Sequence, residues 1–448
     1  MHEIIPQQLK NLANFCPKPL YAVGGSVRDF LCGKRAARFD WDICAPIPAQ
    51  AFAEIATQQG FTVQAVYKNT GTVKLADDRG NDYEYTCFRS DKYVRGTHVP
   101  VEIHFTDDIS LDARRRDFTA NAIYYDIQAN EYVDPLGGIA DAQNRCLRTV
   151  DSAKKVFGED GLRLMRLARQ AAQLGFYPNE ECLQGAKANA ALIQDISPER
   201  IFTELLATLY ADEKYGNTDG PYLGLTLLQK TGVLHYILPE LALGENMAQR
   251  ADFHKYDVLE HSLRAVRYAD KRIRLAALLH DVGKPFCKLR DGNSYAHADE
   301  GARIAAEILT RLKAPKKTVE GVCELILWHM YDFDCKTKEP KLRRFFVEHY
   351  EILEDLLLIK QADYSACADD LQEAPTCRKW RSVLDAMRKE NAPFTLKALA
   401  VNGNDLLTLG IPAPKLARVL HELLLHAAVN PRDNEKARLL RLASALYQ

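Results

Sequence analysis

The sequence predicts an α+β protein, with a small α/β head over residues 1–145 and an all-helical body after it. In the head, short runs of β-branched and aromatic residues are bounded by Gly, Asp, Asn or Pro, which is typical of strands joined by turns. From about residue 146 onward, apolar residues recur at helical spacing instead. At 448 residues and 47% hydrophobic composition, the chain can build several packed domains.

The individual elements follow from these patterns in chain order. Strands are expected at 20–25, 40–45, 71–76, 83–88 and 101–105. Helices are expected at 147–157, 161–175, 199–210, 264–280 and 302–312. Connecting segments at 239–253 and 366–377 divide the helical part into a neck and body (146–245), a histidine-rich unit (246–370) and a tail (371–448).

Composition excludes several classes of protein. Lys and Arg total 59 against 60 for Asp and Glu, so any anionic partner must be held by local patches and not by a global positive field. No apolar run approaches the roughly 20 residues of a membrane helix, and the N-terminal segment lacks a signal-peptide core. The 11 cysteines form no CxxC pair, which favours reduced thiols. A cytoplasmic protein is expected, without a membrane or protein partner.

Two aspartates in the head indicate a metal site. Asp40 and Asp42 lie two apart on an expected strand, so alternation puts both carboxylates on one face. Two adjacent carboxylates repel unless a cation lies between them, and Mg²⁺ suits carboxylates that share it with substrate phosphates. The preceding turn, Gly24 and Gly25 before a helix, suits an anion. The alternative is two exposed aspartates at a strand end.

These motifs also resemble a known family. GGSVRD (24–29) followed by DWDI (40–43) resembles the signature of the class II tRNA nucleotidyltransferase and bacterial poly(A) polymerase family, within the polymerase-β-like superfamily. Further segments similar to the family's motifs follow in order at 71–89, 90–105, 114–123, 158–169 and 197–205. The resemblance implies a polymerase-β-like nucleotidyltransferase head on a helical body.

The resemblance assigns roles to residues of the head. It implies that Asp40 and Asp42 hold Mg²⁺ ions for phosphoryl transfer, with Glu84 either a third carboxylate or one half of a cross-strand ion pair. The residues implied to bind the triphosphate and sugar of the incoming nucleotide, or to support that site, are Gly24, Gly25, Arg28, Arg116, Asp117 and Asn121.

A second group of residues is expected to select the nucleotide. Asp160, Arg163 and Arg166 recur every three residues, so they would line one side of a helix. An Asp–Arg pair can accept from an exocyclic amino group and donate to a ring nitrogen, a combination that cytosine and adenine present. The pair would accept CTP or ATP and reject UTP or GTP. The alternative is an ordinary helical salt bridge.

The histidine-rich unit resembles the metal-binding core of the HD phosphohydrolase superfamily. Its pattern is His261, then His280 with Asp281, then Asp363. His297 and His329 fall where members with two metals supply further ligands, or are separate structural histidines. Imidazole and carboxylate ligands suit a transition metal such as Mn, Fe, Ni or Zn.

The tail resembles the family's C-terminal helical segment, in which Lys397, Lys415 and Arg418 are expected to contact tRNA phosphates. The resemblance therefore implies an enzyme that adds or repairs the 3′-terminal CCA of tRNA with CTP, ATP and Mg²⁺, recognising the acceptor and TΨC arms by shape. It leaves open an accessory phosphohydrolase activity of the HD unit.

Four alternatives remain. Three lie in the same family: a CC-adding enzyme, an A-adding enzyme and a poly(A) polymerase. The loop at 90–100 keeps Asp91, Tyr93, Arg95 and Pro100, which favours a full CCA-adding enzyme, although residues 96–98 depart from the family's pattern. The fourth is an RNA-binding HD phosphohydrolase with an inactive head.

Overall fold

The computed structural model describes residues 1–34, 41–94 and 100–447. They form two compact units: the first comprises Met1–Leu243 with Ile308–Ala314, and the second comprises Gly244–Glu307 with Pro315–Gln448. In the described ranges, no helix combines the length and apolar character that a bilayer crossing requires.

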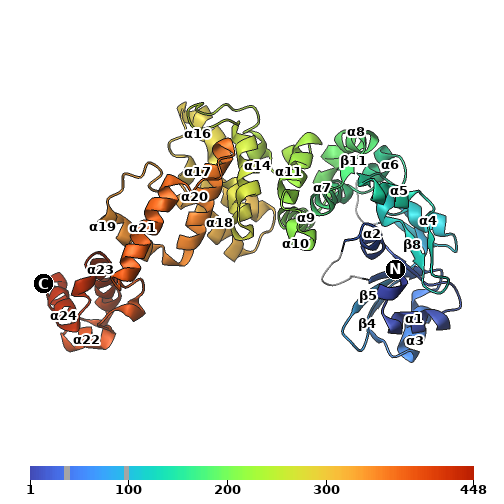
Figure 1. The fold of residues 1–448 in the computed structure, drawn as a ribbon, viewed down its shortest axis with the longest axis horizontal. Coiled ribbons are helices and arrows are strands. Elements are labelled where there is room, and N and C mark those ends of the chain that lie inside the picture. Colours follow the sequence, from blue (N-terminus) through green and yellow to red (C-terminus); the bar gives the residue numbers. More distant parts are fainter. Residues whose placement is uncertain (35–40, 95–99, 448) are drawn as a thin grey trace. The chain divides into compact units, whose positions relative to one another are not determined.

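The first unit begins with a seven-stranded mixed sheet in the order β3-β4-β5-β2-β1-β8-β9. Figure 1 labels β4, β5 and β8 of this sheet. Its strands are β1 (Tyr21–Val23), β2 (Trp41–Ala45), β3 (Thr62–Tyr67), β4 (Thr72–Ala76), β5 (Asp82–Cys87), β8 (Tyr124–Asp126) and β9 (Glu131–Val133). Only β2 and β5 pair in parallel; the other neighbours are antiparallel. Two small ribbons pair β6 (Arg89–Lys92) with β7 (Glu102–Phe105), and β10 (Cys146–Leu147) with β11 (Tyr177–Pro178).

Helices cover this sheet and continue into the neck. The helices of the head are α1 (Gln7–Phe15), α2 (Gly25–Leu31), α3 (Ala49–Gln58), α4 (Ile109–Arg114) and α5 (Gly138–Gln143). Phe52 of α3 stacks on Tyr85 of β5 with ring centroids 3.6 Å apart, which fixes α3 on the sheet. Burial of such aromatic area is a main source of stability in a small head.

The neck is built around one long amphipathic helix, α7, whose apolar side is buried against α9 and α11. The neck helices are α6 (Ala153–Glu159), α7 (Leu162–Leu174), α8 (Glu180–Asn189), α9 (Pro198–Leu209), α10 (Asp212–Tyr215), α11 (Gly220–Lys230), α12 (Leu234–Ile237) and α13 (Pro239–Ala242). The polar residues Arg163, Arg166 and Gln170 of α7 face the cavity described below.

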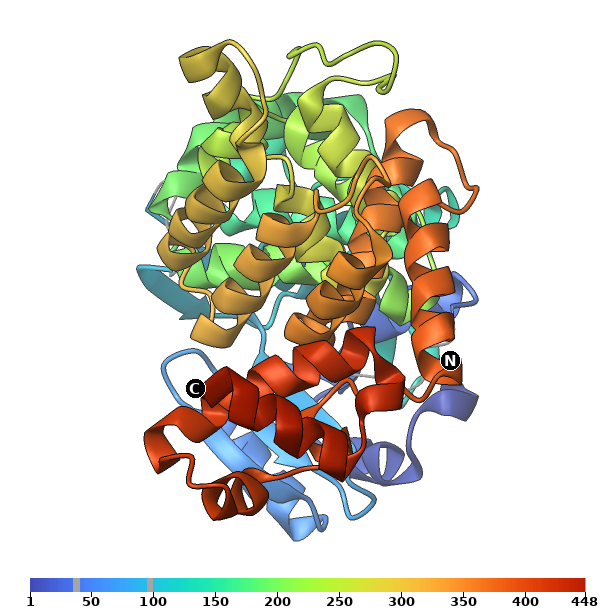
Figure 2. The ribbon, with the colours of Figure 1, turned by 90° about the vertical axis from the view of Figure 1, so that its left-hand side faces the viewer.

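In the second unit, all the described elements are helices. They are α14 (Val258–Tyr268), α15 (Arg274–Leu279), α16 (Gly283–Asp291), α17 (His297–Arg311), α18 (Lys316–Trp328), α19 (Glu339–Glu348), α20 (Leu353–Ala368), α21 (Pro375–Lys389), α22 (Gly403–Thr408), α23 (Leu416–Val429) and α24 (Lys436–Tyr447). The last residues of α17 belong to the first unit. The buried Trp380 packs against Phe345 and Phe346 of α19. Figure 2 shows the last helices, in red, packed on one another.

The structure confirms the predicted α+β class, and each of the five expected strands is present. Two helix predictions need correction. The segment 147–157 becomes helical only at Ala153, because residues 146 and 147 pair as a strand with β11. The segment 264–280 is broken at Ala269, where the Asp270 carboxylate accepts from the amide of Arg272 and caps a new turn.

Candidate active site and metal centre

The turn between β1 and α2 brings backbone against a carboxylate. Val23 lies opposite Asp42 in the antiparallel pair of β1 and β2. Gly24 follows with φ +79°, and a Cβ there would lie 2.9 Å from Asp42 Oδ2. Only glycine can adopt this conformation at so short a distance. The exposed carboxylate of Asp42 therefore shares its space with the turn, while Asp40 lies outside the described residues.

Glu84 is Asp42's direct partner in the parallel pair of β2 and β5, so both carboxylates are on the same face of the sheet. Lys74 of β4 is Glu84's other neighbour, with Nζ 4.0 Å from Glu84 Oε2. Both side chains of that ion pair are about half exposed. The position of Glu84 is thus compatible with either role, as a third metal carboxylate beside Asp42 or as the partner of Lys74 in a cross-strand ion pair.

A buried polar chain links α2 to the neck. The Arg28 guanidinium donates to Asp29 at 2.7 Å and to the side-chain oxygen of Asn121. The Asn121 amide in turn donates to Asp117 at 2.9 Å and to Gln170 of α7 at 2.9 Å. Because these residues are almost fully buried, the chain of hydrogen bonds fixes the glycine turn and residues 115–119 (the RRDFT segment) in one arrangement.

Asp117 is the centre of this chain. It accepts from Arg166 at 2.6 Å and from Gln170 at 3.2 Å, besides Asn121. Burial alone would raise the pKa of Asp117, but the Arg166 guanidinium and the hydrogen bond from Asn121 hold that pKa well below its usual range. Asp117 is thus a permanent anion that orients Arg166 at the edge of the site.

Asp112 has a similar role that sequence reasoning missed. This fully buried carboxylate bonds Arg115 at 2.7 Å, Arg116 at 3.1 Å and the Tyr124 hydroxyl at 2.7 Å. Burial would raise the pKa of Asp112, but the two guanidiniums lower it to about 2. The spacings i+3 and i+4 from Asp112 to the arginines were the available signal, since both fall on one face of a helical turn.

The placement of Asp160 corrects a prediction. Asp160 does not lie on the helix with Arg163 and Arg166; it is extended between α6 and α7, and it accepts from the Leu162 amide at 2.9 Å. Arg163 Nε is still 3.9 Å from Asp160 Oδ2. Burial raises the pKa of Asp160.

The Arg163 guanidinium is 4% exposed and has several protein acceptors. It donates to the Arg115 carbonyl at 2.8 Å, the Val156 carbonyl at 3.0 Å and Glu159 at 3.3 Å. Its ring neighbour is Tyr93, with the guanidinium carbon 5.5 Å from the ring centroid. Tyr93 follows β6, so the 90–100 loop contacts the arginine expected to select the nucleotide; Arg95 lies outside the described residues.

These parts enclose one cavity of about 330 Å³. All nine residues implied to bind nucleotide line this cavity, together with Asp42 and six other residues. The lining residues are Gly24, Gly25, Arg28, Asp42, Arg115, Arg116, Asp117, Asn121, Asp160, Arg163, Arg166, Arg169, Gln170, Gln173, Leu174 and Lys214. Its six arginines and one lysine against three aspartates make the cavity cationic, as a polyphosphate site requires.

The second unit brings the HD residues together from five segments. His261 is in α14, His280 and Asp281 follow α15, His297 begins α17, His329 follows α18, and Asp363 is in α20. His261 Nε2 lies 3.0 Å from Asp363 Oδ1 and 3.3 Å from Asp281 Oδ2. His297 Nε2 lies 3.3 Å from Asp281 Oδ1, so Asp281 lies between both groups of histidines. Lys284 Nζ is 2.6 Å from the same carboxylate.

Backbone geometry orients the histidines of this cluster. Nδ1 of His280, His297 and His329 lies 2.8, 2.6 and 2.6 Å from the carbonyl three residues earlier. A carbonyl only accepts, so Nδ1 carries the proton and the Nε2 lone pair faces the cluster. Gly283 allows the approach of α17, because a Cβ there would lie 2.3 Å from the His297 carbonyl oxygen.

The charges of the cluster fit a metal cation. Burial would raise the pKa of both Asp281 and Asp363. Neighbouring histidines, and Lys284 in the case of Asp281, instead hold both pKa values well below their usual range. Burial would lower the pKa of His280, but Asp281 and Asp363 raise it to about 10, whereas burial and His297 lower that of His329 to about 3. The buried Asp281 and the half-buried Asp363 among four imidazoles are a donor set for a divalent transition metal, which would take the place of the proton on His280 Nε2.

The residues expected to contact tRNA are all exposed. Lys397 lies just before α22, Lys415 precedes α23 and Arg418 is in its first turn. In the same tail, Lys436 forms an ion pair, with its Nζ 2.5 Å from Asp405.

Comparison with protein families divides the chain into three matched segments. Residues 20–148 match the Poly A polymerase head domain, and residues 175–243 match the probable RNA and SrmB-binding site of polymerase A. Residues 254–366 match the HD domain.

Comparison with whole proteins covers almost the entire chain. An A-adding tRNA nucleotidyltransferase of Deinococcus radiodurans is 31% identical over 90% of this chain and 89% of its own length. A CC-adding tRNA nucleotidyltransferase of Thermus thermophilus is 31% identical over 80% of this chain and 79% of its own. The crystal structure of the Bacillus stearothermophilus CCA-adding enzyme in complex with CTP aligns with a TM-score of 0.68 and 26% identity, over 98% of this chain and 96% of that one. The chain therefore belongs to the tRNA nucleotidyltransferase and poly(A) polymerase family, is an enzyme of that family, and carries an HD domain.

Proposed function

We propose that this enzyme adds CCA to the 3′ end of tRNA, using CTP and ATP. The observation that carries the proposal is the single cationic cavity that joins the glycine turn and Asp42 to the RRDFT segment and α7. The 3′-hydroxyl of the RNA attacks the α-phosphate of the nucleotide, a phosphodiester forms, and pyrophosphate leaves. No polynucleotide template is needed, because the protein itself offers the groups that read the base.

The residues divide this work. Asp40 and Asp42, with Glu84 as a candidate third ligand, would hold Mg²⁺, for which hard carboxylate oxygens suit. The bound ions would supply charge stabilisation at the reacting phosphate. The Gly24–Gly25 turn and Arg28 would hold the triphosphate. The two glycines have no side chain, so the backbone of the turn can approach the phosphates closely. Arg116, oriented by Asp112, would hold phosphate or sugar oxygens.

The base would be read at the junction of α6 and α7. Asp160 would accept from the amino group of cytosine or adenine, and Arg163 would donate to the ring nitrogen. Burial of both side chains makes an unmatched base costly. The hydrogen bonds of Arg163 to protein use the two N–H groups of Nη1 and one of Nη2, so its Nε–H and second Nη2–H are the donors that would serve a base.

Two further roles complete the proposal. The HD cluster would bind a transition metal (Mn, Fe, Ni or Zn) through His261, His280, Asp281 and Asp363, with His297 and His329 as further ligands, and hydrolyse phosphoesters as an accessory activity. Residues 371–448 would form the tRNA-binding tail, in which Lys397, Lys415 and Arg418 contact phosphates of the acceptor and TΨC arms.

The test is an addition assay on two RNAs. One tRNA ends at the discriminator base and the other ends after CC, and each is incubated with Mg²⁺ and one labelled nucleotide at a time. We expect CMP to be added to the first RNA, AMP to the second, and neither UMP nor GMP to either. Failure to extend either RNA, or long oligo(A) addition to both, would contradict the proposal.

A second candidate is an A-adding enzyme, which the 31% identity to the Deinococcus radiodurans protein over 89% of its length favours. The same assay separates the two functions. An A-adding enzyme extends only the tRNA that ends in CC, and CTP has no effect on either RNA.

A further inference from the structure

His261 differs from the other three histidines of the HD cluster in the hydrogen bonding of its Nδ1 atom. His280, His297 and His329 each bond a carbonyl through Nδ1. His261 is fully buried, and its Nδ1 finds no hydrogen-bond partner among the described residues. Since its Nε2 faces Asp281 and Asp363, the ring geometry turns Nδ1 away from the HD carboxylates. A buried ring nitrogen without a partner is destabilising and calls for an explanation.

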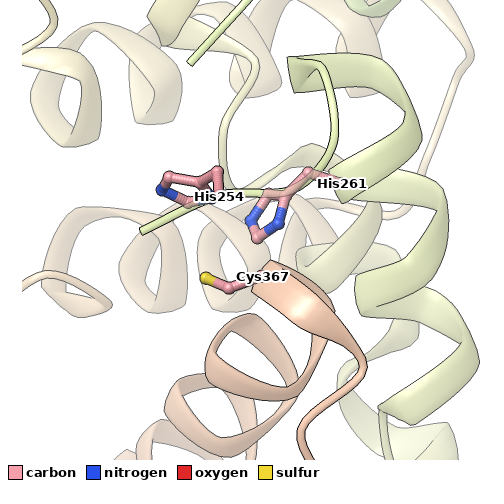
Figure 3. Close-up of side chains that lie close together, drawn as sticks. All are labelled: His254, His261 and Cys367. Carbon is pink, nitrogen blue, oxygen red and sulfur yellow. The ribbon is translucent and has the colours of Figure 1, made fainter. Parts of the chain in front are cut away.

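Two other ligand groups lie close to His261. His254 and Cys367 each offer an atom within 4.8 Å of the other two. Figure 3 shows the His254 and His261 rings and the Cys367 thiol gathered around one space. The two rings are perpendicular, with centroids 4.9 Å apart, and His254 Nδ1 is also buried without a hydrogen-bond partner in the described structure.

The backbone holds these groups in place. The Lys255 amide donates to the Cys367 carbonyl at 2.8 Å, so the segment before α14 is fixed against the last turn of α20. This backbone hydrogen bond joins Cys367 to the residue that follows His254. It therefore holds the His254 and Cys367 side chains close together.

We propose that His254, His261 and Cys367 bind a zinc ion at a site separate from the HD residues Asp281, His297 and His329. Two imidazole nitrogens and a thiolate are a donor set typical of zinc, with a fourth position open to water or another ligand. The Cys367 thiol donates to the Asp363 carbonyl at 3.4 Å, so its proton passes to solvent when zinc binds. With zinc on Nδ1, the ring proton of His261 is on Nε2, where Asp281 and Asp363 accept it; binding of an HD metal at Nε2 as well would release that proton to solvent and leave an imidazolate bridge between the two ions.

The test uses cobalt as a spectroscopic substitute for zinc in the full-length protein. After removal of metal with a chelator, Co²⁺ is titrated, and the thiolate-to-Co²⁺ charge-transfer absorption is recorded in the near ultraviolet. We expect wild type to develop this band and lose it when Zn²⁺ is added. Cys367→Ser should abolish the band, whereas Cys323→Ser, a half-buried cysteine of α18, should keep it.

Two more variants make the test decisive. His254→Gln, a half-buried position outside any helix, should weaken Co²⁺ binding at this site at least tenfold. Asp281→Asn should leave the thiolate band in place, because Asp281 belongs to the HD group and not to this one. A wild type without the band, a band unchanged in Cys367→Ser, unchanged affinity in His254→Gln, or loss of the band in Asp281→Asn would each overturn the proposal. Nucleotide addition is not involved in any of these readouts.

Discussion

The nucleotide cavity and the HD cluster use buried carboxylates in opposite ways. Asp117, which lines the cavity, and Asp112, which bonds two arginines of its lining, are 5% and 0% exposed. In the HD cluster, Asp281 is 1% exposed and faces histidine Nε2 atoms and one lysine. A carboxylate neutralised by arginine orients that arginine, whereas a carboxylate among imidazole lone pairs is suited to a cation.

The difference extends to solvent access. In the cavity, the carboxylate proposed to hold Mg²⁺, Asp42, is exposed, so a metal can arrive together with the triphosphate. The histidines of the HD cluster are 0–4% exposed, which suits an ion that stays bound between reactions. The comparison teaches that the proposed nucleotide site places oriented cations around one accessible carboxylate, whereas the proposed metal site encloses imidazoles around a buried carboxylate.

The largest expected effect is the loss of nucleotide addition in Asp42→Ala. Removal of several kcal/mol of charge stabilisation should lower kcat by about a thousandfold or more. Binding of tRNA should change little, because Asp42 is a metal carboxylate and not an RNA contact. Asp40→Ala should behave in the same way.

The matched control is Asp78→Ala, an exposed carboxylate of a head loop. It should keep full activity, and the HD metal content of all three variants should equal that of wild type. Turnover of Asp42→Ala at saturating Mg²⁺ near the wild-type rate would remove Asp42 from the metal site.

The converse experiment is Asp281→Asn. It should remove the tightly bound transition metal and any phosphohydrolase activity, because this carboxylate lies between both groups of HD histidines. Nucleotide addition should remain within about twofold. The measurement is elemental analysis of purified protein, with addition assayed in parallel. Equal metal content in wild type and variant would show that the cluster is structural.

Much of this comparison could be predicted from the sequence. Alternation on a strand placed Asp42 on one face, and a double glycine before a helix predicted the close turn where Gly24 now meets that carboxylate. The order His261, His280–Asp281, Asp363 predicted a cluster that the helices do assemble. The strand and the glycine turn follow from short local patterns, whereas the cluster, spread over residues 261–363, was expected from the resemblance to the HD superfamily.

Other features depend on contacts that spacing does not encode. A helical period suggested that Asp160 lies on α7, but the helix begins only at Leu162. Asp112 belongs to a helix of six residues, and its importance comes from full burial beside two arginines. His254 and Cys367 are remote in sequence and meet only because α14 packs against α20.

Asp112→Asn tests the arginine-orienting carboxylate. Loss of the carboxylate charge that Arg115 and Arg116 share should lower the free energy of unfolding at pH 7 by about 3 kcal/mol and raise KM for both nucleotides. The exposed pair of Asp107 and Lys18 is the control, since Asp107→Asn should cost less than about 1 kcal/mol.

The effect should depend on pH in a defined direction. The pKa of Asp112 is about 2 in the folded protein, below its ordinary value of 3.8. Its stabilisation is therefore complete above about pH 4 and is lost as the pH falls toward 2. Urea unfolding at several pH values should show wild type and Asp112→Asn converging in acid. A gap that stays constant from pH 7 to pH 3 would assign the effect to packing alone.

A smaller effect is expected on base selection. Asp160→Ala should reduce the preference for CTP over UTP at least tenfold, because the acceptor for the amino group is gone. Glu159→Gln is the matched control: Glu159 also contacts Arg163, at 3.3 Å, but has no assigned base contact. Competition assays on tRNA lacking CCA measure the ratio. If CTP and UTP incorporation slow equally in Asp160→Ala, Asp160 supports Arg163 and does not read the base.

The smallest expected effect separates RNA affinity from both sites. Lys397→Ala and Arg418→Ala should each weaken tRNA binding by a few-fold and reduce the slope of log affinity against log salt by about 1, as expected for one lost phosphate contact. Lys436→Ala is the control in the same tail, because its ammonium is already bonded to Asp405 at 2.5 Å. Fluorescence anisotropy with labelled tRNA over a range of salt concentrations gives the slope.

Since these residues belong neither to the lining of the cavity nor to the HD cluster, kcat at saturating tRNA and the metal content should both stay at wild-type values. A reduced kcat with an unchanged slope would mean that the tail acts on the reaction and not on RNA affinity.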